Sequence, residues 1–471
     1  MKQLVDRFPQ GVVQIPPSKS EAHRVLICAA LAKTKETKGD GSSVFVPELG
    51  LSEDVRATAV GIQTIVTNGE KGGTVDCGES GSTLRFLIPV AAMTGGEWTF
   101  TGRGRLLDRP MGIFADLFRS HGAHYEQTPE GITVRGPLPA GVYELPGDVS
   151  SQFVSGLLLA LPLADAPLSS PRSRESHSEI ILTSPLESAG YVDLTIETMR
   201  SYGIIVRDSR LRGNDSSGDS RLRGNDKGAN GNDSSGDSRL RGNDKGANCT
   251  DGTDGVVTGW RVPAGQRYFS PGAGEEHVCG GDWSQAAFFL CAGALGCDVS
   301  VAGLERESVQ GDRRVADILE SMGAHVAWRA GLVRAYPPAE GRLHGVVIDA
   351  RDIPDIVPPL AALACYASGE TQFRNAGRLR IKESDRLAAL SEELAKLGAD
   401  IRETPDGLVI QGNGGAKLRG GAVQAHGDHR IAMALAVAAI GCETPVVIDG
   451  AESVAKSYPA FWDDFLKHGM E

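Results

Sequence analysis

The sequence lacks the features that mark several common protein classes. Its eight cysteines form no CxxC pair and no Cys/His spacing typical of a metal site, which predicts reduced thiols and no bound metal. The longest apolar run, from Ile431 to Ile440, is too short to cross a bilayer. The N-terminal residues contain no apolar segment of a secretion signal. These absences argue against a membrane protein and predict a cytoplasmic location.

Basic residues are also in deficit, because 48 Lys and Arg stand against 60 Asp and Glu, for a net charge of −12. This balance argues against a general nucleic-acid-binding protein. Any anion-binding site must therefore come from a local cluster of Lys and Arg in an acidic chain. The 471 residues suffice for two or three domains, and an apolar fraction of 41% is typical of a soluble globular protein.

A recurring pattern divides the chain into α/β units. At several places a helical apolar pattern ends on a glycine, as is typical of a helix C-cap, and a β-like run follows. The spacing of these glycines predicts about six units of roughly 60 to 80 residues, with one longer interval. The glycines are Gly61, Gly122, Gly203, Gly323 and Gly398, with Gly469 at the end of the last helix.

The long interval contains a repeated polar segment. Residues 214–230 recur without change at 232–248, and residues 208–250 include only three large apolar side chains. We therefore expect 208–250 to be disordered. The β-like runs Ile204–Val206 and Val256-Val257 flank it, which predicts an insertion at the tip of a hairpin. A second polar surface insertion is expected at 166–179.

The most informative stretch reads RIKESDR, from Arg380 to Arg386. Leucines at 387, 390, 394 and 397 follow at helical spacing and predict a helix that ends at Gly398. Lys382, Glu383 and Arg386 would share its first turn, where two cations and a carboxylate can hold an anion and transfer a proton. A salt-bridged, solvated helix end has the same composition, so this stretch alone leaves both interpretations open.

Other segments also place hydroxyls or cations at predicted helix starts. A helix N-terminus offers free N–H groups to a phosphate or carboxylate, although an ordinary capped helix looks similar. Because such ends occur in both halves of the chain, a shared polyanionic ligand is the economical explanation. Asp355 and Glu383 among the cations would suit acid–base chemistry on that ligand. The segments are residues 16–24 (PPSKSEAHR), 79–85 (ESGSTLR), 108–110 (DRP), 150–152 (SSQ), 188–191 (SAGY), 353–355 (IPD), 427–433 (GDHRIAM) and 455–459 (AKSYP).

Together with RIKESDR, and apart from the insertions, these segments resemble the 5-enolpyruvylshikimate 3-phosphate synthase family from about Gly11 to Leu466. The resemblance implies an α/β fold of two similar domains, each of three βαβαββ units, of the inside-out α/β barrel type. The first domain would span 17–281, and the second would combine 1–16 with 282–471.

The family resemblance also implies a reaction. The carboxyvinyl group of phosphoenolpyruvate would pass to the 5-hydroxyl of shikimate 3-phosphate, with release of phosphate and with no metal or organic cofactor. These two small molecules would be the partners of a monomer that binds neither nucleic acid nor membrane.

Site residues follow from the resemblance position by position. The candidates for the catalytic proton transfers are Lys19, Asp355 and Glu383, and which group performs which transfer stays open. The implied contacts of shikimate 3-phosphate are Lys19, Ser20, Arg24, Ser150, Ser151, Gln152, Ser188, Asp355 and Lys382. The implied contacts of phosphoenolpyruvate are Lys19, Gly81, Arg109, Gln152, Arg386, Arg430 and Lys456.

Departures from the family pattern and related families supply the alternatives. Pro17 stands where glycine is usual, and ESGSTLR replaces an NAGT-type run, which bears on inhibitor sensitivity. The sibling enzyme that acts on UDP-N-acetylglucosamine typically carries a reactive cysteine in a loop where residues 102–108 contain none. An RNA 3′-phosphate cyclase would need a glycine signature that is absent. A non-catalytic anion-binding paralogue is the remaining alternative.

The implied site draws residues from both domains. Without ligand it would set seven cations against two carboxylates, those of Asp355 and Glu383. Like-charge repulsion then favours an open form, which bound anions would close through their higher affinity for the closed one.

Overall fold

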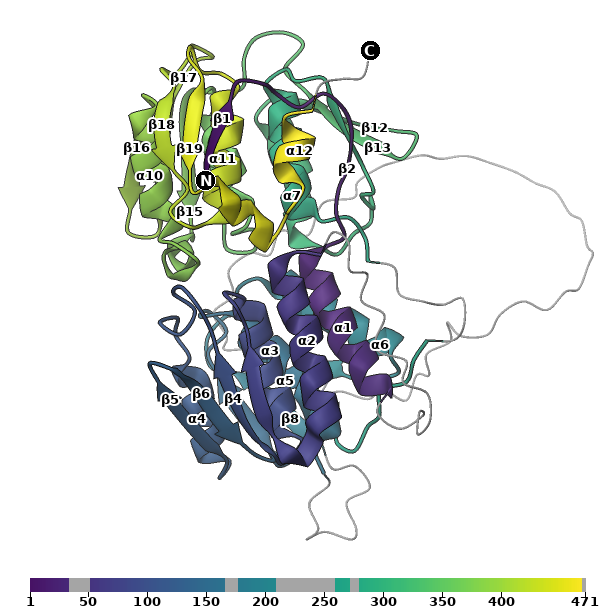
Figure 1. The fold of residues 1–471 in the computed structure, drawn as a ribbon. Helices are drawn as coiled ribbons and strands as arrows, with labels where there is room; N and C mark the ends of the chain where they lie inside the picture. Colours follow the sequence, from purple (N-terminus) through teal and green to yellow (C-terminus); the bar gives the residue numbers. More distant parts are fainter. Residues whose placement is uncertain (34–50, 166–176, 209–258, 272–278, 468–471) are drawn as a thin grey trace, which may run out of the picture.

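The computed structural model describes residues 1–33, 51–165, 177–208, 259–271 and 279–467. They form two bodies that meet along one interface (Figure 1). The first domain contains the helices and strands between Lys19 and Pro263, and the second contains the N-terminal strands and all elements from Trp283 onward. The chain crosses between them near Pro17 and Gly281, which pair in an antiparallel bridge. Among the described helices, none has the length and apolar character to span a membrane.

The first domain packs its helices against one another and against two mixed sheets. One sheet has the order β3 (Gly73–Asp76), β4 (Glu97–Thr101), β6 (Gly131–Arg135), β5 (His124–Thr128). The other has the order β7 (Val142–Leu145), β8 (His177–Leu182), β10 (Gly259–Pro263), β9 (Arg207–Asp208). The helices are α1 (Lys19–Lys33), α2 (Glu53–Asn68), α3 (Gly81–Ala92), α4 (Gly112–Ser120), α5 (Ser151–Ala160) and α6 (Ala189–Ser201).

The second domain repeats this construction with three sheets. The first has the order β12 (His325–Arg329), β13 (Leu332–Tyr336), β11 (Val299–Ala302), β2 (Gly11–Gln14). The second is β14 (Val347–Asp349), β15 (Ser368–Arg374), β17 (Gly407–Asn413), β16 (Asp400–Thr404). The third is β1 (Lys2–Val5), β19 (Val446–Asp449), β18 (Gly421–Gln424). The helices are α7 (Trp283–Ala294), α8 (Val315–Ser321), α9 (Val357–Ala364), α10 (Arg386–Lys396), α11 (His429–Ala439) and α12 (Phe461–Phe465).

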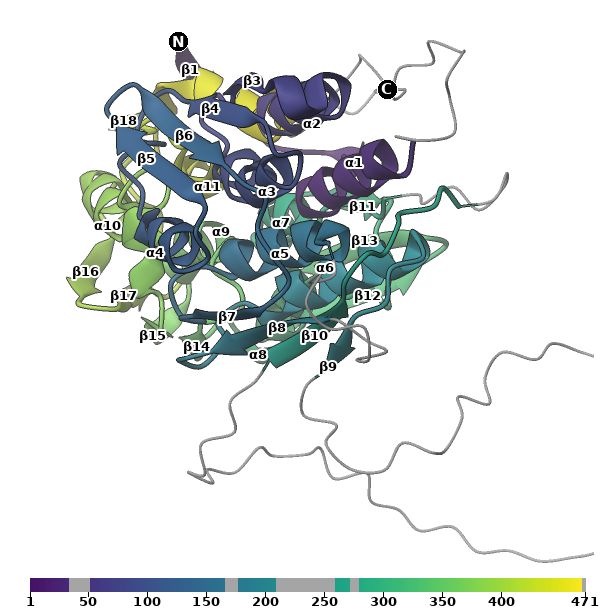
Figure 2. The same ribbon diagram turned by 90° about the horizontal axis from the view of Figure 1, so that it is seen from below.

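Helices form the interior of each domain, because several of them are apolar on every side. All residues of α7, α9 and α11 are buried, and only Ser82 of α3 and Gln152 of α5 escape full burial. A helix without a polar face must be covered all round, here by neighbouring helices and by sheets outside them. Figure 2 shows α3 and α5 nearly end on, with strands β4–β6 to one side and β7, β8 and β10 to another. The predicted inside-out α/β architecture is confirmed.

The glycine prediction holds at four of the described positions and fails at one. Gly122, Gly203, Gly323 and Gly398 follow helices with φ of 72°, 80°, 94° and 96°, where glycine fits best. Gly61 instead lies inside α2, where a Cβ would stand 2.7 Å from Leu87 Cδ1, so close helix packing requires it. About six α/β units were predicted, and the described part of the chain contains five sheets. Gly469 and residues 34–50 lie outside that part.

The hairpin predicted around the repeat segment is present but shifted. β9 pairs antiparallel with β10, with Asp208 opposite Trp260, so the strands begin slightly after the expected runs. The predicted disorder falls on residues that, apart from Asp208, lie outside the described part. The second insertion, expected at 166–179, must end before His177, because β8 includes Glu179 and pairs it with Arg261.

This pairing allows a clean removal of the repeat segment. If a single Asn replaces residues 209–258, Asp208 and Trp260 are joined by Asn-Gly259, the sequence favoured in two-residue hairpin turns. We expect turnover within about twofold of the full chain and a thermal midpoint at least as high, because a long loop costs closure entropy. Steady-state kinetics and thermal unfolding of both proteins provide the test. A folded, inactive product would show that the segment contributes to activity.

Candidate active site

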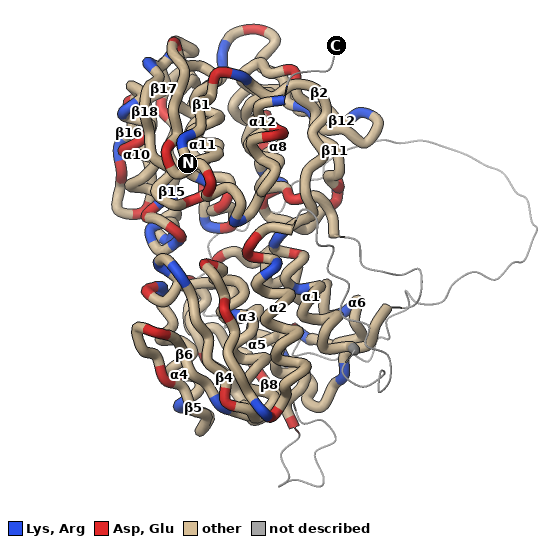
Figure 3. Tube along the Cα trace, in the orientation of Figure 1, with Lys and Arg blue, Asp and Glu red and all other residues tan. Residues whose placement is uncertain are grey.

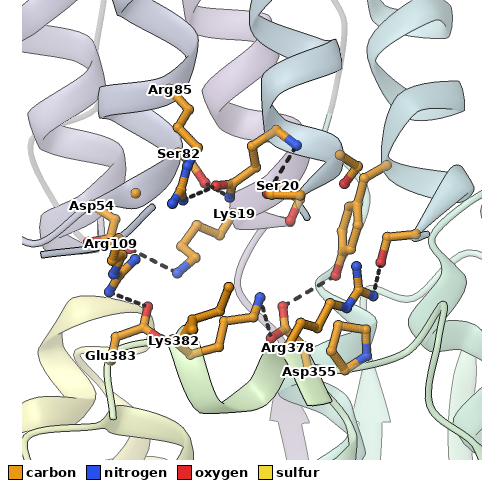
Figure 4. Close-up of a pocket in the computed structure, with 18 of the residues that line it drawn as sticks. Lys19, Ser20, Asp54, Ser82, Arg85, Arg109, Asp355, Arg378, Lys382 and Glu383 are labelled. Carbon is orange, nitrogen blue, oxygen red and sulfur yellow. Dashed lines mark hydrogen bonds and ion pairs between the residues drawn. The ribbon is translucent and has the colours of Figure 1, made fainter. Parts of the chain in front are cut away.

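A pocket lies where the two domains face each other, and the starts of several helices line it (Figure 4). Every site residue predicted from the sequence borders this pocket except Lys456. α1, α3 and α5 contribute Lys19, Gly81 and Gln152 from the first domain. α10 and α11 contribute Arg386 and Arg430 from the second. The remaining predicted residues on the pocket wall are Ser20, Arg24, Arg109, Ser150, Ser151, Ser188, Asp355, Lys382 and Glu383.

The helix carrying Arg386 starts later than predicted. Asp385 caps α10 by accepting a hydrogen bond from the Ala388 N–H at 3.1 Å, so Arg386 is its first residue. Lys382 and Glu383 therefore precede the helix, and their expected place in its first turn is wrong. A short 3₁₀ helix (Gly377–Ile381) precedes them, and Glu383 still contacts Arg386 Nη2 at 2.7 Å, whereas Lys382 Nζ lies 3.9 Å from Asp355 Oδ1.

The DRP segment, predicted to lie at a helix start, belongs to the loop before the helix. α4 begins at Gly112 with Met111 in the capping position, so Arg109 and Pro110 both precede it. The Arg109 guanidinium nevertheless reaches the pocket. A Cβ at Gly81 would stand 2.6 Å from Arg109 Nη1, so a side chain at Gly81 would displace this cation.

Arg386 is the charged centre of the second-domain wall. Its side chain is 1% exposed, and its Nε, Nη1 and Nη2 atoms donate to Asp428 at 2.8 Å, Asp355 at 3.0 Å and Glu383 at 2.7 Å. Burial alone would lower the pKa of Arg386, but these carboxylates raise it above its usual value. The planar guanidinium thus fixes three acids around one cation.

Cations surround the two candidate proton-transfer carboxylates. Burial would raise the pKa of Asp355, but Arg430, Lys382 and Arg386 bring it well below its usual range. Burial opposes ionisation of Glu383 too, yet Arg386 and Arg109 hold its pKa well below normal. The surrounding cations therefore favour the ionised form of both acids.

Lys382 differs from its neighbours. Burial lowers its pKa to about 8, although Asp355, whose carboxylate lies 3.9 Å from Lys382 Nζ, opposes the shift. The pKa of Lys382 therefore lies nearer to neutral pH than that of an exposed lysine, while its ammonium still acts as a cation beside Asp355.

Hydrogen bonds organise the first-domain wall. Arg85 Nη1 donates to Gln152 Oε1 at 2.9 Å, and Gln152 Nε2 donates to Ser82 Oγ at 2.9 Å, which ties α3 to α5. Burial and then Arg109 lower the pKa of Arg85 to about 9. Arg24 braces α1 against α6, since its guanidinium donates to Thr195 Oγ1 and to the Tyr191 carbonyl.

Several ion pairs and hydrogen bonds join the two domains. Arg109 Nη2 lies 3.5 Å from Glu383 Oε1, and Lys456 Nζ lies 2.6 Å from Glu79 Oε2. The Glu79 pair explains why Lys456 does not border the pocket. Ser188 accepts a hydrogen bond from Arg378. Figure 3 shows basic and acidic residues gathered where the domains meet.

The charge count predicted for this interface is wrong. Besides Asp355 and Glu383, the structure brings Asp54, Glu79 and Asp428 into contact with the site's cations. Their ion pairs reduce the repulsion that was expected to separate the domains, and the described conformation has the domains in contact. A shift between open and closed forms stays a prediction.

Some residues of the pocket were not among the predicted contacts. His429 and Tyr191 belong to the segments at predicted helix starts, 427–433 and 188–191, whereas nothing in the sequence marks Asp54 and Arg378. Arg85 belongs to the segment ESGSTLR, but the family resemblance assigns it no ligand contact. The residues concerned all border the pocket.

Comparison with known proteins identifies the family. The family model for EPSP synthase (3-phosphoshikimate 1-carboxyvinyltransferase) matches residues 8–225 and 252–465. The chain belongs to the EPSP synthase family.

Relatives with this name cover almost the whole chain. The 3-phosphoshikimate 1-carboxyvinyltransferases of Clostridium kluyveri and Clostridium novyi are 39% and 37% identical, over 98% of this chain and 96% and 95% of theirs. The solved EPSP synthase of Acinetobacter baumannii shares the fold, with a TM-score of 0.66 and 22% identity over 98% of this chain and 97% of that one. The enolpyruvyl transferase NikO of Streptomyces tendae gives a TM-score of 0.61 at 16% identity, over 98% and 96% of the two chains.

The buried pair of Arg386 and Asp428 predicts a stability effect. Asp428→Asn keeps the cap of α11 but removes the charge opposite Arg386, so the free energy of unfolding should fall by about 3 kcal/mol. Urea denaturation measures it. Asp116→Asn, which breaks an exposed pair with Arg119, is the control and should change nothing. Equal effects of both substitutions would contradict the role assigned to the buried pair.

Proposed function

We propose that this chain transfers the carboxyvinyl group of phosphoenolpyruvate to the 5-hydroxyl of shikimate 3-phosphate and releases phosphate. Membership of the EPSP synthase family supports this activity. One geometric observation carries the proposal: cations from both domains surround two carboxylates that a single buried arginine holds. Such a pocket suits two anionic substrates and an acid–base reaction between them.

Shikimate 3-phosphate would lie between the two domains, near the starts of α1, α5 and α6. Hydroxyls and N–H groups at the start of α5 offer donors to its phosphate. Asp355 would face its 5-hydroxyl. The proposed contacts are Lys19, Ser20, Arg24, Ser150, Ser151, Gln152, Ser188, Asp355 and Lys382.

Phosphoenolpyruvate would lie beside it, between Arg109 of the first domain and Arg386 and Arg430 of the second. Glycine at position 81 leaves room for the Arg109 guanidinium beside it. Lys456 would have to exchange its ion pair with Glu79 for the substrate carboxylate or phosphate. The proposed contacts are Lys19, Gly81, Arg109, Gln152, Arg386, Arg430 and Lys456.

The reaction requires two proton transfers in its addition step. The 5-hydroxyl loses a proton as its oxygen bonds to C2 of phosphoenolpyruvate, and the methylene carbon gains one. We assign the first transfer to Asp355 and the second to Glu383, with Lys19 orienting the substrates between them. Glu383, a carboxylate after it has donated its proton, then takes a proton back from the new methyl group as phosphate departs, which forms the carboxyvinyl product.

Substrate binding prepares Glu383 for its role. In the structure its pKa is held well below normal, chiefly by Arg386 and Arg109 against the effect of burial. Bound carboxylate and phosphate groups compete for these arginines, which weakens their hold on Glu383 and raises its pKa. Glu383 can then take up a proton and donate it to carbon.

The activity itself is tested by phosphate release. The purified chain should release phosphate only with shikimate 3-phosphate and phosphoenolpyruvate together, and equally in excess chelator. Release with UDP-N-acetylglucosamine in place of shikimate 3-phosphate would refute the proposal.

The role of Glu383 is tested by Glu383→Gln, which keeps its size but cannot transfer a proton. Turnover should fall by roughly a hundred- to ten-thousand-fold, with much smaller changes in substrate affinity. Glu392→Gln, on the exposed side of α10, is the control. Normal turnover in the Glu383 variant would remove that residue from the chemistry, and weaker binding alone would make it a positioning residue.

A further inference from the structure

A buried carboxylate next to the pocket has no part in the mechanism so far. Asp312 lies in a 3₁₀ helix (Gly311–Arg314) before α8 and is 3% exposed. Its Oδ2 accepts a hydrogen bond from the Tyr191 hydroxyl at 2.9 Å. Its Oδ1 is buried without a hydrogen-bond partner among the described residues. Ionising this acid costs free energy, because burial removes the carboxylate from water and only one neutral donor, the Tyr191 hydroxyl, takes the place of that water.

Tyr191 stands between this carboxylate and Asp355. Its hydroxyl oxygen lies 2.9 Å from Asp312 Oδ2 and 3.3 Å from Asp355 Oδ2, so one phenol faces two acids. A phenol has one proton to donate. While it donates to Asp312, its oxygen can form a good hydrogen bond with Asp355 only when Asp355 carries a proton. Both hydrogen bonds of the Tyr191 hydroxyl, to Asp312 and to Asp355, can therefore form well only after Asp355 has taken a proton from a substrate.

We propose that Asp312 holds, between the addition and elimination steps, the proton that Asp355 removes from the attacking hydroxyl, and that the Tyr191 hydroxyl carries it between the two carboxylates. The inference rests on the proposed function, because that function makes Asp355 the base. Asp312 touches no substrate and acts through Tyr191.

The proton balance is simple. The substrate O–H bond breaks as an O–H bond forms on Asp355. That proton moves to the Tyr191 oxygen while the original phenol proton moves to Asp312, which restores the Asp355 carboxylate and neutralises Asp312. The same two shifts in reverse return the proton to Asp355, from which it leaves with the released phosphate. No oxidation or reduction takes place.

The electrostatics favour this direction of transfer. Arg430, Lys382 and Arg386 hold the pKa of Asp355 well below normal despite its burial, so it keeps a proton poorly. Burial, followed by the charge of Asp355, raises the pKa of Asp312 to about 7, with Arg430 opposing. Burial and the two acids raise the pKa of Tyr191 well above its usual value, so the phenol stays protonated and exchanges one proton for another.

The test uses single-turnover phosphate release by the full chain with shikimate 3-phosphate and phosphoenolpyruvate. Asp312→Asn keeps an acceptor for Tyr191 but cannot gain a proton, and Tyr191→Phe removes the connection. Each should slow the chemical step by about ten- to a hundredfold. The double variant should be no slower than the slower single variant, because both substitutions block the same proton path. Asp317→Asn, exposed on α8, is the matched control and should have no effect.

The pH profile gives a readout that a structural role would not move. Asp312 accepts a proton only as a carboxylate, so the wild-type rate should decline as the pH falls through the region near 7, and this limb should be absent in Asp312→Asn. The groups that face Asp312 are Tyr191 of α6, Asp355, Arg430 of α11 and Asp282 at the start of α7. None of them is altered in Asp312→Asn.

A measurement on the unaltered chain covers the case in which a variant does not fold. In mixtures of light and heavy water, a plot of the wild-type rate against the deuterium fraction should be curved, because several protons move together. A straight line, additive effects of the two substitutions, or an unchanged rate in folded Asp312→Asn would overturn the relay. Absence of phosphate release by the wild type would instead overturn the proposed function.

Discussion

The guanidinium of Arg386 contacts Asp428, Asp355 and Glu383 together, and most of the site depends on these contacts. A buried charge of either sign is costly alone, so the four groups stabilise one another as a set. Asp428 caps α11 and so fixes the arginine to the domain interior. The arginine then holds the two acids that we assign to proton transfer at fixed positions on one wall.

The inside-out arrangement brings helix starts together at the domain interface. The helices α3, α5, α7, α9 and α11 run through the domain interiors, where neighbouring elements cover them. Starts of helices from both domains meet at one pocket, where they place the side chains of Lys19, Arg386 and Arg430. A chain with net charge −12 thereby forms a local cationic site.

The sequence was sufficient to predict the fold, the family and most of the pocket wall, because motif residues cluster at helix starts. It was insufficient where contacts between distant parts of the chain determine the position or role of a residue. Gly61 fits a C-cap pattern but serves helix packing, and the place of Glu383 outside the helix depends on the Asp385 cap. Asp312 and Tyr191 are far apart in the chain, so their contact has no local signature. The assigned ligand contacts stay predictions.

The claim that binding converts Glu383 from a carboxylate into an acid is tested most directly by difference infrared spectroscopy. The ligand-free chain should show no protonated carboxyl band from Glu383 at neutral pH. Addition of shikimate 3-phosphate with a non-reactive phosphoenolpyruvate analogue should produce that band, and the same addition to Glu383→Gln should not. A Glu383 that stays ionised in the ternary complex, or that is already protonated without ligand, would contradict the account.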